Sequence, residues 1–425
     1  MKIRYKKTKI GEIPEDWGLI KLSEGSERIT DGSHFSPVPQ KDSDFYIATV
    51  KDMGNHSFNL NTCAKITKEE FLQLVRNGCR PEKGDILFSK DGTIGKTFVF
   101  EGSKPIVLLS SIAIIRLNKS VLDSNFTCQV LKSFIFEKQL EGLRSGSAIR
   151  RLVLKSIKEI RVPLPTITEQ QKIAAIFSRV DEKIEVISNR ISEILTLKKG
   201  LMQRLFTKGI GHSQFKDSAL GVVPESWEVL QLGSLTSKVG SGTTPRGGRE
   251  AYVESGIPFI RSQNVLYNKL DLSKVAYITE EQHEKMSGSQ LMGDDVLLNI
   301  TGASIGRSCV LPSEFRIGNV NQHVCIIRSN GNIIPHYLGK FLNSSLGQNQ
   351  INRFQAGGNR EGLNFQQIRS FKIPLPSIEE QRKIAAILSS VDDKLQILQE
   401  KKETYQELKR GLMQVLLTGK IRVSP

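Results

Sequence analysis

The chain has 425 residues, 38% hydrophobic and 24% charged, a balance typical of folded globular proteins rather than disordered ones. Its formal net charge of +16 favours a polyanionic partner, either nucleic acid or an acidic membrane surface, although a merely basic globular protein could carry the same charge. No apolar run reaches the roughly 18 residues of a membrane span, and the basic N-terminus lacks the apolar core of a secretory signal.

The cysteines and histidines also exclude some classes of protein. The five cysteines form no C-x-x-C pair, and the six histidines show neither an H-E-x-x-H motif nor a ligand cluster. An odd number of cysteines without metal-site spacing indicates reduced, mostly buried thiols in a cytoplasmic protein. We therefore expect no structural metal.

Residues 1–160 predict a mixed α/β domain in which strands dominate. Short β-rich segments flanked by Gly, Asp and Asn cover 85–90, 97–100 and 111–117, whereas helical patterns cover 68–78 and 125–143. The stretch "KDGTIGKT" (90–97) ends like a phosphate-binding loop, but Lys90 stands where that loop needs glycine. A turn between two strands is the favoured interpretation.

Residues 161–212 predict a long helix over about 166–208. Pro163 and Pro165 precede it, Thr166 and Glu169 fit a capping box, and Gly209 is a natural terminator. Apolar residues recur at helical spacing along its whole length, and so long a helix cannot bury this stripe in one small domain. Packing against a second long helix is favoured, and packing across its own domain is the alternative.

The second half of the chain repeats the first. Residues 213–372 predict another α/β domain, with strands at 256–262, 295–300 and 323–329, and residues 373–425 predict a second long helix over about 377–418. "PLPTITEQQKIAAIFSRVDEKI" (163–184) recurs as "PLPSIEEQRKIAAILSSVDDKL" (374–395), and "KKGLMQRLFTKG" (198–209) recurs as "KRGLMQVLLTGK" (409–420), both 211 positions later. We predict an antiparallel two-helix coiled coil and an internal pseudo-two-fold repeat.

These repeated phrases, alternating with two divergent regions, resemble the specificity (S) subunit of type I restriction-modification systems. The resemblance implies that 1–160 and 213–372 are target recognition domains and that 161–212 and 373–425 are spacer helices. It implies double-stranded DNA, two methylation subunits and restriction subunits as partners, with no membrane partner. S-adenosylmethionine, ATP and Mg²⁺ would be bound by those subunits and no cofactor by this chain, which would be a non-catalytic, cytoplasmic protein.

Candidate DNA-binding residues were sought where loops gather cations, amides and hydroxyls, because Arg and Lys read guanine whereas Asn and Gln read adenine. For any one of them a solvated loop side chain is the alternative. In the first domain they are Ser33, His34, Lys51, Ser89, Lys90, Arg144, Arg150 and Arg151. In the second they are Arg246, Arg249, Arg261, Gln263, Asn264, Asn321, Gln322, His323, Arg353, Asn359 and Arg360.

Two other classes of function remain open. A coiled-coil scaffold would also have paired helices, but it would not need two large, divergent, cation-bearing domains, and a DNA-binding protein outside restriction-modification is a related alternative. A stand-alone enzyme would need catalytic residues, and the sequence offers no such constellation. The isolated His56 and His212 are interpreted as surface residues.

Overall fold

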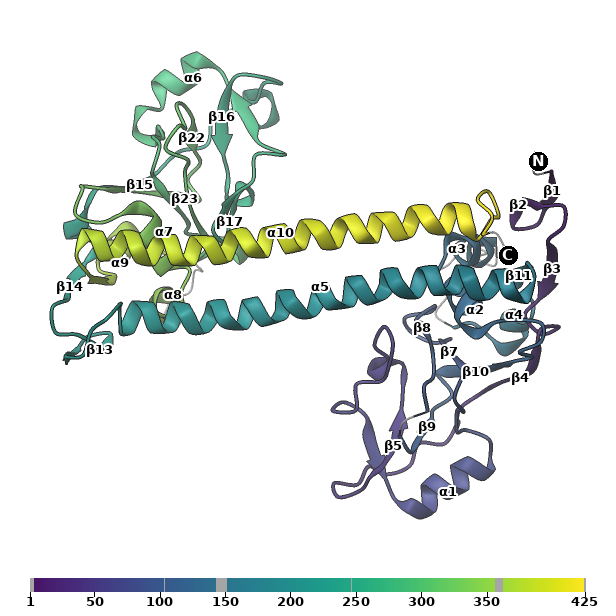
Figure 1. The fold of residues 1–425 in the computed structure, drawn as a ribbon. Coiled ribbons are helices and arrows are strands. Elements are labelled where there is room, and N and C mark those ends of the chain that lie inside the picture. Colours follow the sequence, from purple (N-terminus) through teal and green to yellow (C-terminus); the bar gives the residue numbers. More distant parts are fainter. Residues whose placement is uncertain (1–3, 103, 143–150, 246, 356–361, 424–425) are drawn as a thin grey trace. The chain divides into compact units, whose positions relative to one another are not determined.

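The computed structural model describes residues 4–102, 104–142, 151–245, 247–355 and 362–423. The chain divides into two compact units (Figure 1). The first unit comprises Met1–Ser188 and Glu400–Pro425, and the second comprises Asn189–Gln399. Each unit therefore contains one α/β domain together with part of both long helices, so the units interleave along the sequence.

The first α/β domain is built on two small sheets. A four-stranded antiparallel sheet has the order β4-β10-β7-β8, and a three-stranded sheet has the order β6-β5-β9, in which β5 and β9 are parallel. The strands are β4 (Ser26–Asp31), β5 (Phe45–Ala48), β6 (Ala64–Ile66), β7 (Ile86–Ser89), β8 (Thr97–Val99), β9 (Ile106–Leu108) and β10 (Ile112–Leu117). Helix α1 (Lys68–Arg76) packs Phe71 and Leu74 against the three-stranded sheet.

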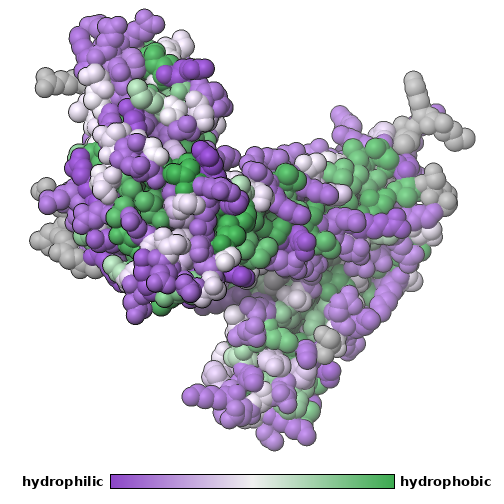
Figure 2. Space-filling view, turned by 60° about the vertical axis from the view of Figure 1, so that its left-hand side comes forward, coloured by the Kyte–Doolittle hydropathy of each residue, from purple (hydrophilic) through white to green (hydrophobic). Residues whose placement is uncertain are grey.

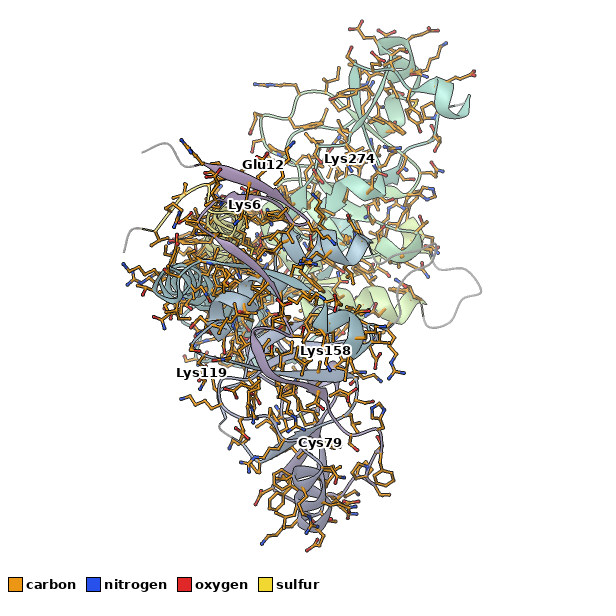
Figure 3. The ribbon with its side chains drawn as sticks, turned by 90° about the vertical axis from the view of Figure 1, so that its right-hand side faces the viewer. Lys6, Glu12, Cys79, Lys119, Lys158 and Lys274 are labelled. Atoms are coloured by element: carbon orange, nitrogen blue, oxygen red, sulfur yellow. The ribbon has the colours of Figure 1, made fainter. Side chains whose placement is uncertain are left out.

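Two further strand pairs connect this domain to the long helix. The hairpin of β1 (Tyr5–Thr8) and β2 (Gly11–Pro14) carries Lys6 and Glu12 on its two strands (Figure 3). Strand β3 (Gly18–Lys21) pairs with β11 (Arg161–Leu164), the strand that leads into the helix. Trp17 is thereby held beside the start of that helix. Three shorter helices complete the domain: α2 (Ser124–Leu131), α3 (Phe134–Gly142) and α4 (Leu154–Lys158).

The second α/β domain repeats this plan. Its four-stranded sheet has the order β15-β23-β20-β21, and its three-stranded sheet has the order β19-β16-β22. These strands are β15 (Thr236–Ser241), β16 (Ile257–Ile260), β19 (Ala276–Ile278), β20 (Val296–Asn299), β21 (Ser308–Val310), β22 (Asn319–Val320) and β23 (Val324–Ser329). The paired short strands are β12 (Phe215–Ser218) with β13 (Gly221–Pro224), β14 (Glu228–Gln231) with β24 (Lys372–Leu375), and β17 (Val265–Leu266) with β18 (Lys269–Leu270). The helices are α6 (Glu280–Lys285), α7 (Pro335–Leu342), α8 (Ser345–Gln355) and α9 (Phe365–Arg369).

The two long helices are α5 (Ile167–Thr207) and α10 (Ile378–Leu416), within two residues of the predicted bounds. Each follows a hydroxyl cap: the Thr166 Oγ1 accepts from the Glu169 N–H at 3.3 Å, and the Ser377 Oγ does the same for Glu380. Beyond each helix lies a glycine with positive φ, +61° at Gly209 and +66° at Gly419, as a C-terminal cap requires.

Within each unit α5 and α10 run side by side and antiparallel (Figure 1). In the first unit Ile173 and Phe177 of α5 share a core with Met413 of α10. In the second, Phe206 of α5 shares a core with Leu388 of α10. The predicted fold class is confirmed. Packing of each long helix across its own domain, the alternative, is also found in part. The same apolar residues belong to the cores of the adjoining α/β domains.

The segment predicted as helical over 125–143 forms two helices, because α2 and α3 are separated at Lys132 and Ser133. The Ser133 Oγ donates to the Val130 carbonyl at 2.7 Å and accepts from the Ile135 N–H, so it ends one helix and starts the next. Ser344 makes the corresponding break between α7 and α8.

The cysteines lie inside the two units, and the outer surface mixes polar and apolar side chains (Figure 2). All five cysteines are buried and free of disulfides. Among the described residues, no helix combines the length and apolarity needed to cross a membrane. The face drawn in Figure 2 is largely hydrophilic with smaller hydrophobic patches, and several large apolar side chains of the long helices are exposed, among them Val186, Leu195 and Ile397.

Candidate nucleic-acid interface

In the first unit, the sequence-predicted residues meet at one edge of the four-stranded sheet, around the turn between β7 and β8. This turn follows a strand and precedes a strand, so it is the expected strand connection and not a phosphate-binding loop. The Lys90 N–H donates to the Ser111 carbonyl, and the Lys90 carbonyl accepts from Leu152 at 2.7 Å. Three separate segments of the chain are thereby brought together at this edge.

The Lys90 ammonium is buried there in an ion-pair network. It lies 3.1 Å from the Asp31 carboxylate and 3.6 Å from that of Asp91, and only 2% of the side chain is exposed. The Arg151 Nε lies 3.2 Å from Asp91 on the outer side, with 55% of that side chain exposed. Lys90 therefore positions the edge, whereas Arg151 has its charge where a ligand could reach it.

Two more candidates lie exposed at the same edge. The imidazole of His34 is 67% exposed and lies 3.5 Å from Asp31. Lys51 is exposed in the short helix η1 (Val50–Asp52), which is held to the edge because the Val50 N–H donates to the Ser111 Oγ. His34, Lys51 and Arg151 are thus the described candidates of this unit that face solvent.

Ser33 and Ser89 face inward instead. The Ser33 Oγ accepts from the Phe35 N–H at 3.0 Å, and the Ser89 Oγ donates to the Thr93 carbonyl and accepts from the Lys96 N–H. Both side chains are buried. Their hydroxyls shape the turns, so they do not lie where a base edge could reach them.

In the second unit, the equivalent edge contains an open cavity of about 450 Å³. It is lined by Ser262, Gln263, Thr301, Gly302, Ala303, Ser304, Arg307 and His323. The Thr301 Oγ1 and the His323 Nδ1 lie 2.6 Å apart, which fixes the ring at the cavity wall. Gln263 is exposed, and its amide Nε2 lies 3.5 Å from the Lys274 carbonyl. Two predicted residues, Gln263 and His323, therefore converge here.

Asn264 and Asn321 support this edge from inside. The Asn264 Oδ1 accepts from the Arg261 N–H, and its Nδ2 donates to the Asp271 carbonyl at 2.8 Å. The Asn321 Oδ1 accepts from the His323 N–H at 3.1 Å. Both asparagines are buried. They hold the backbone of the edge and have no exposed amide to offer a base.

The remaining predicted residues of the second unit are spread more widely. Arg261 is partly buried, and its guanidinium lies 5.8 Å from the centre of the Tyr252 ring. Gln322 is exposed and accepts a hydrogen bond from Thr244, and Arg353 is exposed on α8. Arg144, Arg150, Arg246, Asn359 and Arg360 lie outside the described residues, as does the side chain of Arg249.

A second basic surface was missed by the sequence analysis. It is a cavity of about 330 Å³ at the opposite end of β7, and its basic lining residues are Arg28, Arg80, Lys83, Lys104 and Arg116. Asp85 holds Arg116 through two hydrogen bonds of 3.0 and 2.9 Å, which raise the pKa of that guanidinium. These cations come from separate segments, so no local pattern in the sequence brings them together.

The glutamate near the start of each long helix, Glu169 or Glu380, was predicted only as part of a capping box, but it also contacts the α/β domain. The Glu169 carboxylate accepts from the Trp17 Nε1 at 3.2 Å and from the Arg422 Nε at 2.7 Å. It does not reach back to its own cap, so only the hydroxyl half of the predicted capping box is formed. Trp17 and Glu169 recur in the second copy as Trp227 and Glu380. This shared pair was the sequence signal that could have predicted the contact.

Glu380 makes the same contact in the second unit, with one change. It accepts from the Trp227 Nε1 at 3.1 Å and from the Ile210 N–H at 2.8 Å, and the His212 Nε2 lies 3.0 Å away. His212 is therefore not the surface residue that the sequence suggested. In each unit the glutamate joins the domain that precedes its helix to the segment that follows the other helix.

The glutamines beside these glutamates fasten the helices to their domains. The buried Gln170 accepts from the Asp123 N–H at 2.8 Å and donates to the Val121 carbonyl. The buried Gln381 accepts from the Ile334 N–H at 2.8 Å. Both glutamines are thus satisfied by backbone of the α/β domain, which explains why both copies of the repeat retain this residue.

Among the residues that the structure describes, no group of three or more His, Cys, Asp and Glu side chains is placed to hold a metal ion. The two sheet edges instead expose cationic and amide side chains, the groups that bind phosphates and base edges.

Comparison with known proteins gives consistent matches over nearly the whole chain. Residues 14–196 and 224–408 match the family described as "Type I restriction modification DNA specificity domain". The putative type I restriction enzyme MjaX specificity subunit of Methanocaldococcus jannaschii is 31% identical, covering 99% of this chain and 97% of that protein. The MjaVIII specificity subunit of the same organism is 26% identical over 97% of this chain and 94% of its own length.

Solved structures share the fold. The crystal structure of the type I restriction-modification S subunit from M. genitalium gives a TM-score of 0.61 at 17% sequence identity, covering 98% of this chain and 99% of that one. A chain from a structure concerned with assembly and conformational transition of the type I R-M system gives 0.54 at 15% identity, covering 96% and 99%.

Proposed function

Because this chain belongs to the type I restriction-modification DNA specificity family, we propose that it is the DNA-recognition subunit of such a complex. Each α/β domain would read one half of a bipartite, asymmetric double-stranded target. One observation supports this proposal most directly. The two domains share one topology, but the corresponding edges of their four-stranded sheets carry different side chains.

The difference between the two edges supports different half-sites. The first edge exposes His34, Lys51 and Arg151 around a buried lysine. The second exposes Gln263 and has the partly buried His323 in the wall of an open cavity. Arginine and lysine favour guanine whereas glutamine favours adenine, so two such edges select different bases. The net charge of +16 supplies the nonspecific attraction to phosphates that accompanies base readout.

We propose that the paired helices set the distance between the half-sites and dock two copies of a methylation subunit. Each helix is continuous for about 40 residues, a stiff element of roughly 60 Å. The doubled segments offer the same surface twice, as two copies of one partner require. Exposed apolar side chains such as Val186 and Ile397 provide contact area for such a partner.

The chemistry would belong to the partners. S-adenosylmethionine would be bound by the methylation subunits, and ATP and Mg²⁺ by restriction subunits, with this chain contributing only recognition and no catalysis. Its place of action would be the cytoplasm, where the DNA of a prokaryotic cell lies.

The test is to express the chain with its methylation subunit in cells that lack other adenine methylation, and to map methylated sites by sequencing. We expect one split, asymmetric motif. Replacing residues 213–372 with the matching region of a relative should change one half of that motif and leave the other unchanged. Loss of methylation with the parent chain, or change of both halves after the exchange, would overturn the proposal.

A further inference from the structure

Gln129 in α2 is a buried residue at which the two copies of the repeat differ in charge. Its counterpart 211 residues later is Lys340 in α7, just as Asp181 in α5 corresponds to Asp392 in α10. In the second unit the Asp392 carboxylate binds two ammonium groups, those of Lys198 and Lys340.

In the first unit the same carboxylate has only one cation. The Lys409 ammonium lies 2.7 Å from Asp181, and the second position is taken by the Gln129 amide, whose Nε2 donates to Asp181 at 3.0 Å. A neutral side chain thus replaces the second lysine. Asp181 therefore binds one ammonium group where Asp392 binds two.

Gln129 is itself incompletely bonded. Only 7% of it is exposed, and among the described residues its Oε1 has no hydrogen-bond partner. A buried amide oxygen without a donor costs free energy, so a donor placed beside it would be favourable. In the second unit Lys340 occupies this position, and it leaves no unsatisfied acceptor because an ammonium group has only donors.

Gln129 and Asp181 line a cavity of about 220 Å³ between the α/β domain and α5. Its charged lining consists of Glu101, Asp181, Glu182, Glu185 and Lys132. Four carboxylates and one lysine therefore line the cavity. Two of these carboxylates also have cations beside them, Asp181 with Lys409 and Glu101 with Lys83 at 4.0 Å, which leaves Glu182 and Glu185 as the further acidic groups. This local charge would repel DNA phosphates and attract a cation.

We propose that this cavity receives a lysine or arginine side chain of the methylation subunit, which supplies from outside the cation that Lys340 supplies within the second unit. The inference rests on the proposed function, because it uses the docking of that subunit along α5. The Gln129 oxygen and the carboxylates together match the several N–H donors of such a group. The two docking surfaces would then share the repeated helix and differ at this cavity.

The decisive variant is Gln129→Lys, which gives the first unit the residue that the second unit already has. Its ammonium would bind Asp181 and occupy the cavity, so the melting temperature should not fall. Binding of the purified methylation subunit, measured by surface plasmon resonance at low and moderate salt, should weaken about tenfold, as expected for loss of one charge-assisted contact. The double variant Glu182→Gln, Glu185→Gln should weaken it similarly without adding a side chain.

The matched control is Asp393→Asn, at the position of the second unit that corresponds to Glu182. It should leave binding unchanged, because Lys340 already satisfies the neighbouring Asp392. Normal binding by Gln129→Lys and by the double variant would overturn the cavity proposal alone. Failure of the parent chain to bind the subunit at all would overturn the proposed function and this inference with it. A free polyamine is the other possible source of the cation. If spermidine binds saturably, Gln129→Lys abolishes that binding and subunit binding is unchanged, then the cavity binds a polyamine and the proposal of a methylation-subunit side chain is wrong.

Discussion

The Asp181 carboxylate of the first helix copy lies 2.7 Å from the Lys409 ammonium of the second copy. The same pair recurs in reverse in the second unit, where Asp392 of the second copy binds Lys198 of the first. Asp392 is the repeat of Asp181, and Lys409 is the repeat of Lys198. Each aspartate therefore binds the lysine of the opposite copy, which is the pattern of a two-fold interface. The repeated helix surface is therefore complementary to its own second copy, as in an isologous two-fold interface.

Removing Asp392 should therefore cost more stability than removing Asp181. Asp392→Ala leaves two partly buried lysines without a counter-charge, and we expect a loss of about 3 kcal/mol. Asp181→Ala leaves one lysine and one amide, for a loss of about 1–2 kcal/mol. Urea unfolding of the two variants measures the difference, and a larger loss for Asp181→Ala would contradict this ranking.

Glu380 should be a strong determinant of stability, unlike the neighbouring Glu379. Glu380→Ala removes the acceptor of the Trp227 Nε1 and the Ile210 N–H, and we expect a loss of about 2 kcal/mol in the free energy of unfolding. Glu379 is exposed and pairs only with Lys383 one turn away, so Glu379→Ala is the matched control and should leave the unfolding midpoint unchanged. Equal effects of the two substitutions would show that the contact with Trp227 is not stabilising.

The cysteines should be unreactive in the native protein. Burial raises the pKa of the Cys309 and Cys325 thiols from 9.0 to about 12. Iodoacetamide at about pH 8 should therefore alkylate them only after denaturation, since the thiolate is the nucleophile. Counting alkylated cysteines by mass spectrometry tests this, and rapid modification of the folded protein would contradict it.

The same thiols predict a fall in stability at high pH. Between pH 9.0 and about 12 the folded state keeps protons on Cys309 and Cys325 that the unfolded state releases. Because stability decreases with pH where the folded state binds more protons, the unfolding midpoint should decline through this window. Cysteine-to-serine variants at both positions should flatten the decline measured by thermal unfolding, and an unchanged slope would rule out this origin.

Recognition should be separable at the two sheet edges. Arg151→Ala should relax one half of the methylated motif, and the pair Gln263→Ala with His323→Ala should relax the other, by roughly ten- to thousand-fold if bidentate base contacts are lost. Methylated-site sequencing gives the readout. Lys285→Ala, on the exposed face of α6, is the control that should change neither half. Uniform loss across all sites would instead indicate phosphate contacts.

The organisation of the chain was visible in the sequence, because repeated segments, prolines and terminal glycines are local signals. The long helices follow from them, whereas the strand–turn–strand at Lys90 follows from a lysine in place of the glycine that a phosphate-binding loop needs, and the buried cysteines from their number and spacing. The break at Ser133 was missed because a single serine can continue or end a helix, depending on which carbonyl its hydroxyl reaches.

The candidate interface was only partly predictable, because burial separates residues of the same chemical type. Ser89 and Lys51 both looked like loop residues, yet one hydroxyl closes a turn inside the domain and the other side chain is exposed. The cavity around Gln263 and His323 depends on loops far apart in the sequence. Composition can identify such residues, but only tertiary contacts show which of them face solvent.

The positions of Trp17 and Trp227 make intrinsic fluorescence a separate probe of each unit. These are the only two tryptophans of the chain, one in each unit, and both indoles are buried with Nε1 donating to a glutamate. Replacing either one with phenylalanine leaves a single fluorophore whose emission reports the junction of one domain with its helix. The loosening of each half by heat, denaturant or a bound partner can then be followed separately, without an attached label.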